Sequence, residues 1–220
     1  MQTPIFKPQT EWTAPTSFPD LSKYNEIAID LETKDPNLNE RMGSGSVLGI
    51  GDVVGVSLST GDWNAYYPIA HEGGGNLDRK MVLKWLQDQM STDSTKIFHN
   101  AMYDVCWIRN LGLNINGLVV DTMVACSLLD ENRFSYTLNT LSWHFLNKGK
   151  NEKALTEAAK QRGLDAKADM WQLPASEVGA YAEKDAELTF ELWQHVKKLI
   201  IEEDIQDIFN LETDLFPCLV

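Results

Sequence analysis

The segment spanning residues 25–32 constrains the fold most strongly, because apolar side chains recur there at every second position. These recurring residues are Ile27, Ile29 and Leu31. A period of two predicts a β-strand with the three side chains on one face. The other face carries Asp30 and Glu32, and like charges on one face of a strand repel. A solvated strand face is the simpler explanation, whereas divalent cations bound there would remove the repulsion.

The net charge limits how this chain could bind nucleic acid. Its 220 residues include 19 Lys and Arg against 32 Asp and Glu, which gives a net charge of −13. Such acidity argues against a protein that coats nucleic acid by charge alone. It does not exclude an enzyme that acts on nucleic acid, because a site built from carboxylates and divalent cations is itself acidic. With 43% apolar residues, the composition is that of one sizeable globular domain, with or without a small appendage.

Several classes of protein are excluded by what the sequence lacks. No stretch approaches the roughly 18 consecutive apolar residues that a membrane span requires, so we expect no membrane partner. Residues 1–19 are polar and contain several prolines, unlike a signal peptide. The three cysteines lack CxxC spacing, which argues against a disulfide scaffold or a thiolate zinc site. A reducing compartment, the cytoplasm, is therefore the expected location.

The order of the expected elements indicates the fold class. Further strands are expected at 47–59, 63–69, 96–98 and 118–120. Helices are expected from Asp78 through Met90 and at 101–111, 121–130, 137–147, 151–162 and 175–204. The chain begins with strands, continues with alternating strands and helices, and ends with helices. This order favours an α/β fold with a mixed β-sheet flanked by α-helices. Residues 1–24 form an extended arm in this interpretation, and residues 25–204 form the main domain.

Two other acids lie where a helix is expected to face the core. Asp104 lies at the edge of the apolar stripe of helix 101–111. In helix 175–204, Asp185 continues the apolar stripe, and Tyr181 lies one turn earlier on the same face. A buried carboxylate without a partner is costly, so it should be paired or bound to metal. Each acid alone could be solvated or salt-bridged, but the ordered set favours a metal site.

Three short motifs together resemble those of a known family. They are Asp30–Thr33 (DLET), His99–Asp104 (HNAMYD) and Tyr181–Asp185 (YAEKD). They resemble motifs I, II and III of the DEDDy 3′–5′ exonucleases. The whole stretch 25–204 resembles the proofreading domain of family A DNA polymerases, particularly those of bacteriophage type. The subclass with a histidine general base has it five residues before the last Asp. Ala180 stands there, so the tyrosine subclass is the one resembled.

The resemblance implies a ribonuclease H-like fold and hydrolysis with two divalent ions, Mg²⁺ or Mn²⁺. The implied metal ligands are Asp30, Glu32, Asp104 and Asp185. Asp30 would bridge both ions, and Asp104 would assist. Tyr181 would orient the attacking water, while Asn100 and Thr33 would contact the 3′-terminal nucleotide. Carboxylates suit this role because hard cations prefer oxygen ligands.

The expected function is a metal-dependent 3′–5′ exonuclease that acts on single-stranded DNA as the proofreading part of a DNA polymerase. Its expected partners are a single-stranded DNA 3′ end and the polymerase domain of the same polypeptide, into which residues 205–220 would lead. The cytoplasm would be that of the host if the chain comes from a phage. Two alternatives stay open: a stand-alone exoribonuclease resembling ribonuclease D, and a non-catalytic nucleic-acid-binding domain. The motifs assign no role to residues 34–51 or to the basic segment 148–170.

Overall fold

The computed structural model describes residues 11–39 and 44–220, with a five-stranded sheet at its centre. The strands are β1 (Glu26–Lys34), β2 (Asp52–Ser59), β3 (Asn64–Pro68), β4 (Thr95–Phe98) and β5 (Val119–Asp121). Their order across the sheet is β3-β2-β1-β4-β5. The β3, β2 and β1 strands pair antiparallel, whereas β1, β4 and β5 pair parallel. The sheet is therefore mixed, as predicted, and β1 lies at its centre.

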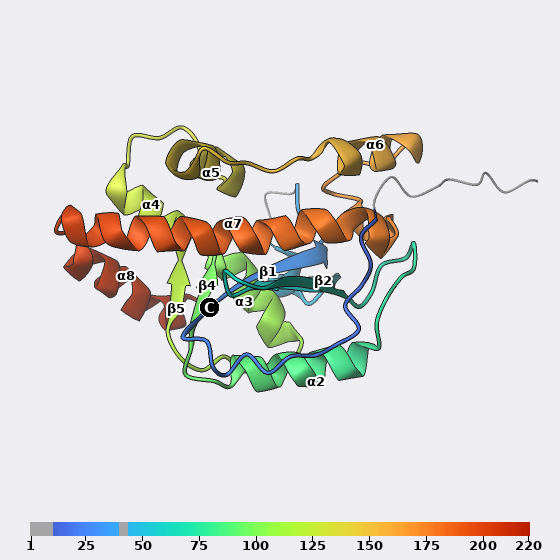
Figure 1. The fold of residues 1–220 in the computed structure, drawn as a ribbon, viewed down its shortest axis with the longest axis horizontal. Coiled ribbons are helices and arrows are strands. Elements are labelled where there is room, and N and C mark those ends of the chain that lie inside the picture. Colours follow the sequence, from blue (N-terminus) through green and yellow to red (C-terminus); the bar gives the residue numbers. More distant parts are fainter. Residues whose placement is uncertain (1–10, 40–43) are drawn as a thin grey trace, which may run out of the picture.

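Helices cover both faces of this sheet (Figure 1). One face is covered by α2 (Arg79–Met90) and α3 (Ala101–Asn110). The other is covered by α7 (Ala175–Glu202), against which α4 (Thr122–Leu129), α5 (Leu138–Leu146) and α6 (Lys153–Gln161) pack. The remaining elements are α1 (Gly45–Leu48), the 3-10 turn η1 (Met170–Gln172) and α8 (Gln206–Leu219). None of the helices in the described part of the chain is both long and apolar enough to cross a membrane.

The two faces of β1 explain why a site forms there. Ile27, Ile29 and Leu31 are at most 6% exposed and pack with residues of α2 and α3. On the opposite face, Ala28 is buried in the cluster that includes residues of α4, α5 and α7. Asp30 and Glu32 follow Ala28 on that face, so the alternation predicted from the sequence is confirmed. The strand thus aims two carboxylates at the layer containing α7.

The structure differs from the strand that the sequence predicts at 47–59. The strand begins only at Asp52, because α1 occupies residues 45–48. Ser44 accepts the Ser46 N–H at the start of α1 (3.2 Å). Gly49 and Gly51 then have φ values of +67° and +92°, a left-handed conformation that ends a helix and excludes a regular strand. Residues 40–43 lie outside the described residues.

The segment before β1 packs against α2. Residues 1–10 of the expected arm lie outside the described residues, and residues 11–24 contain no helix or strand. Leu21 is buried in the core. Trp85 of α2 donates its indole N–H to the carbonyl of Pro19 at 2.8 Å. This part of the chain therefore covers one side of the core.

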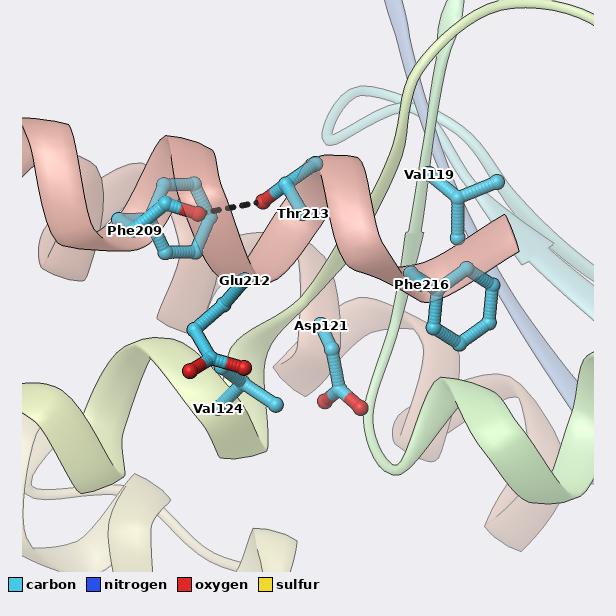
Figure 2. Close-up of a pocket in the computed structure, with 7 residues that line it drawn as sticks. All are labelled: Val119, Asp121, Val124, Phe209, Glu212, Thr213 and Phe216. Carbon is cyan, nitrogen blue, oxygen red and sulfur yellow. Dashed lines mark hydrogen bonds between the residues drawn. The ribbon is translucent and has the colours of Figure 1, made fainter. Parts of the chain in front are cut away.

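After α7 the chain continues into α8, which the sequence patterns do not predict. Phe209 and Phe216 of α8 line a narrow pocket with Val119 of β5 and Val124 of α4 (Figure 2). The side chains that α8 exposes include Leu211, Leu215 and Leu219. The helix therefore covers the β5 edge of the sheet and presents leucines to its surroundings.

Candidate active site

Three carboxylates from two distant segments converge beside the centre of the sheet. Asp30 and Glu32 come from β1, and Asp185 comes from α7. One carboxylate oxygen from each lies within 4.8 Å of the others. Small residues face the two strand acids across the β1–β2 pair: Ser57 is opposite Asp30, and Gly55 is opposite Glu32. A Cβ at Gly55 would lie 2.1 Å from the hydroxyl oxygen of Tyr66, so the missing side chain there makes room for this buried tyrosine.

The donor set fits a divalent cation. Asp185 is only 4% exposed, and its Oδ1 atom is buried without a hydrogen-bond partner. An orphaned buried oxygen costs free energy unless something binds it. Carboxylate oxygens are the ligands that hard divalent ions prefer. The cluster of Asp30, Glu32 and Asp185 therefore suggests a divalent metal site.

The electrostatics of the cluster show how crowded it is. Burial raises the pKa of Asp30 to about 8, and the charge of Asp185 acts in the same direction. Burial and the charge of Asp30 also raise the pKa of Glu32 well above its ordinary value. The ammonium of Lys150 opposes both increases. These acids thus resist ionising together unless further positive charge is present.

Asp104 lies next to this cluster rather than within it. It projects from α3, is 4% exposed, and its Oδ1 accepts the backbone N–H of Leu31 in β1 (3.1 Å). Burial and the charge of Asp30 raise its pKa. One oxygen of Asp104 is therefore committed to the strand that carries Asp30 and Glu32, and the contact ties α3 to that strand.

Tyr181 and Asp185 lie one turn apart on α7, as their spacing predicts, and both contact Lys150. The Lys150 Nζ atom lies 2.6 Å from Asp185 Oδ2 and 3.1 Å from Tyr181 Oη. Burial and the charge of Asp185 raise the pKa of Tyr181 far above its ordinary value. Sequence reasoning missed Lys150, which belongs to the basic segment left without a role. Lys150 belongs to no recognised motif, and its position within the basic segment 148–170 is the one sequence feature that could have pointed to it.

A pocket of about 530 Å³ lies beside Asp30, the one member of the carboxylate cluster among its lining residues. Asp30, Asn100, Lys150 and Phe134 are among the residues that line it, and Phe134 is fully exposed. Thr33 is not among the lining residues. Its hydroxyl lies 2.7 Å from the hydroxyl of Tyr103, beyond a register shift that follows Glu32. The structure therefore brings Asn100 to the pocket but not Thr33.

Asp121 shapes this wall of the pocket. Asn100 is in the left-handed conformation (φ 68°), and its side chain does not cap α3. Instead, the carboxylate of Asp121 accepts the N–H groups of Asn100 (2.9 Å) and Ala101 (2.8 Å) at the start of α3. It also accepts the N–H of Met123 at the start of α4. One aspartate thus caps two helices, which sequence reasoning did not identify.

Replacing Asp121 by alanine is expected to lower the free energy of unfolding by about 2 kcal/mol, because several helix-terminal N–H groups lose their acceptor. Urea denaturation measures this cost. Asp78→Ala is the matched control and should cost less, since the side chain of Asp78 caps α2 by accepting one backbone N–H, that of Met81. Equal costs for the two variants would contradict the double-capping role.

Comparison with known proteins decides the family. Residues 7–201 match the family model described as 3′–5′ exonuclease. The chain belongs to this family. The DNA-directed DNA polymerase of Pseudomonas phage M6 is 33% identical over 227 residues, covering 100% of this chain and 34% of that polymerase. The DNA polymerase DpoZ of Salmonella phage PMBT28 is 28% identical over 211 residues, covering 92% of this chain and 31% of that polymerase.

This exonuclease chain therefore spans about a third of the length of these curated relatives. Among solved structures, Brucella melitensis NrnC with bound Mg²⁺ matches with a TM-score of 0.63 and 16% identity, covering 94% of this chain and 88% of NrnC. At that identity the likeness shows the fold alone, which is ribonuclease H-like. The predicted family, the fold and the relation to polymerase proofreading domains are thus confirmed.

Proposed function

We propose that this exonuclease domain removes nucleotides from the 3′ end of single-stranded DNA with the help of two divalent ions, Mg²⁺ or Mn²⁺. The observation that carries the proposal is the convergence of Asp30, Glu32 and Asp185, whose oxygens lie within 4.8 Å of one another. The Mg²⁺ bound to NrnC supports the choice of a divalent ion. The DNA polymerases among the relatives favour DNA as the substrate.

Each residue has a proposed part in this hydrolysis. Two bound ions supply an activated hydroxide and stabilise the leaving 3′ oxygen. Asp30, Glu32 and Asp185 would hold them, and Asp104 would assist from α3. The hydroxyl of Tyr181 can both donate and accept a hydrogen bond, which suits it to orient the attacking water.

The substrate end is proposed to lie in the pocket beside Asp30. Asn100 and the exposed ring of Phe134 line that pocket, and an aromatic ring can stack on any base. Thr33 lies outside this pocket and its hydroxyl contacts that of Tyr103, so a contact between Thr33 and the terminal nucleotide would need the strand to extend beyond the pocket. A single strand would place its terminal phosphodiester next to the carboxylates.

We propose that the partner of this domain is a polymerase domain of the same polypeptide, acting in the cytoplasm of the host. The phage relatives are about three times as long as this chain. The leucines that α8 exposes, Leu211, Leu215 and Leu219, would suit burial against another domain, because exposed apolar patches mark interaction sites.

The decisive experiment follows a 5′-labelled single-stranded oligonucleotide with Mg²⁺ or Mn²⁺ present. We expect a ladder that shortens from the 3′ end, requires the metal, and disappears with Asp30→Ala and with Asp185→Ala. An RNA of the same sequence, run in parallel, tests the exoribonuclease alternative, which faster RNA cleavage would favour. Equal degradation by the wild type and both variants would reject the proposal, and metal-independent binding without cleavage would favour the non-catalytic alternative.

A further inference from the structure

Lys150 brings a fixed positive charge into the carboxylate cluster. Its ammonium lies 2.6 Å from Asp185 Oδ2 and 3.1 Å from Tyr181 Oη, and also faces the tyrosine ring at 4.9 Å. The side chains of the ion pair are 12% and 6% exposed. Solvent screens such a pair much less than one at the surface.

The backbone before Lys150 is built to direct it inwards. α5 ends at Leu146, and the next residue, Asn147, is left-handed with φ of +52°. Gly149 then approaches α5 so closely that a Cβ there would lie 2.0 Å from the indole nitrogen of Trp143. The N–H of Lys150 itself donates to Asn139 Oδ1 of α5 at 3.0 Å. The position of Lys150 is therefore determined by α5 as well as by its own ion pair.

The neighbouring lysine shows that charge alone does not define this contact. Lys148 lies on the other side of Gly149 and pairs with Glu191 of α7 at 2.7 Å. Its side chain is 53% exposed, so that pair lies in solvent. Two lysines of one loop thus reach the same helix, but only Lys150 reaches the carboxylates that would bind metal.

The ammonium of Lys150, paired with Asp185, opposes the binding of a divalent ion to the same carboxylates. The two cations would share one carboxylate, and like charges a few ångströms apart in a partly buried site repel strongly. Resting on the metal site proposed above, we propose that Lys150 sets the affinity of this site for divalent ions by competing with them for Asp185. A phosphate of the substrate adds negative charge, so the competition weakens when substrate is bound.

The test measures Mn²⁺ binding to the full chain without nucleic acid, by the electron paramagnetic resonance signal of free Mn²⁺. Lys150→Met should lower the Kd for Mn²⁺ about tenfold or more, the change that corresponds to about 1.4 kcal/mol. Lys148→Met, the matched control, should leave the Kd unchanged. Equal Kd values for the wild type and Lys150→Met would overturn the inference while leaving the proposed function standing. A wild type that binds no Mn²⁺ would overturn both.

A second measurement covers the case in which Lys150→Met folds poorly. In EDTA the variant should melt at a lower temperature than the wild type, because the carboxylates lose their counter-charge. Adding either Mn²⁺ or the second change Asp185→Asn should recover the loss. If neither recovers it, Lys150 supports the fold through packing alone, and the inference is wrong.

Discussion

Asp30→Asn is expected to abolish exonuclease activity and, at the same time, to stabilise the protein in EDTA. The amide keeps the size of the carboxylate but cannot replace it as an anionic ligand of a hard cation. We expect turnover of the single-stranded oligonucleotide to fall at least about a thousandfold, since metal ions supply several kcal/mol of transition-state stabilisation.

The stability gain follows from the crowding at Asp30. Burial and the charge of Asp185 raise the pKa of Asp30 to about 8, so ionising this side chain in the folded protein is costly. A neutral asparagine removes that cost, and the melting temperature in EDTA should rise. Glu32→Gln should act in the same direction, because the pKa of Glu32 is raised by the same causes.

Asp185→Asn is the informative contrast to Asp30→Asn. It also removes a metal ligand, so activity should be lost equally. It breaks the ion pair with Lys150 (2.6 Å), however, and leaves that ammonium without its closest partner, so the melting temperature in EDTA should fall. Asp52→Asn controls for charge removal, because Asp52 pairs with Arg79 at the surface. Activity retained in Asp30→Asn, or a melting temperature that falls with it, would contradict this account.

The parts of the site that local patterns predict are those set by a single element. The alternation in β1 places Asp30 and Glu32 on the face opposite Ile29 because a strand has a period of two. The spacing of Tyr181 and Asp185 places both on one face of α7 because a helix has about 3.6 residues per turn. The resemblance to the exonuclease motifs adds that this face of β1 and this face of α7 lie together, which cannot be inferred from the periodicity of either element alone.

The parts that the sequence did not reveal depend on contacts between elements. Lys150 enters the site because Gly149 fits against Trp143, a contact that no local pattern encodes. The left-handed Asn100 is held by Asp121, 21 positions later in the chain. The contact between the hydroxyls of Thr33 and Tyr103, which follows a register shift after Glu32, also joins residues far apart in the chain, and the expected contact of Thr33 with the substrate stays a prediction.

The second large effect is expected in stability: we expect both the free energy of unfolding and the stabilisation by divalent ions to depend on pH. The folded protein keeps a proton on Asp30 up to about pH 8, whereas the unfolded chain releases it near 3.8. Between these values the folded state binds more protons, so the free energy of unfolding falls as pH rises. Buried His71 and His99, whose pKa values are lowered from 6.5 to about 4, act in the opposite direction, but only below about pH 6.5.

From about pH 6.5 to pH 8 the carboxylates dominate the pH dependence, and Lys96, whose pKa burial lowers from 10.5 to about 8, opposes them only at the upper end. In EDTA the melting temperature should fall across this interval. Divalent ions bind the deprotonated carboxylates, so the increase in melting temperature that Mg²⁺ produces should grow as pH rises. Asp30→Asn should flatten the slope in EDTA and reduce the Mg²⁺-dependent increase. A Mg²⁺ effect of constant size across the interval, or an unchanged slope in Asp30→Asn, would mean that proton release from these acids is not linked to metal binding.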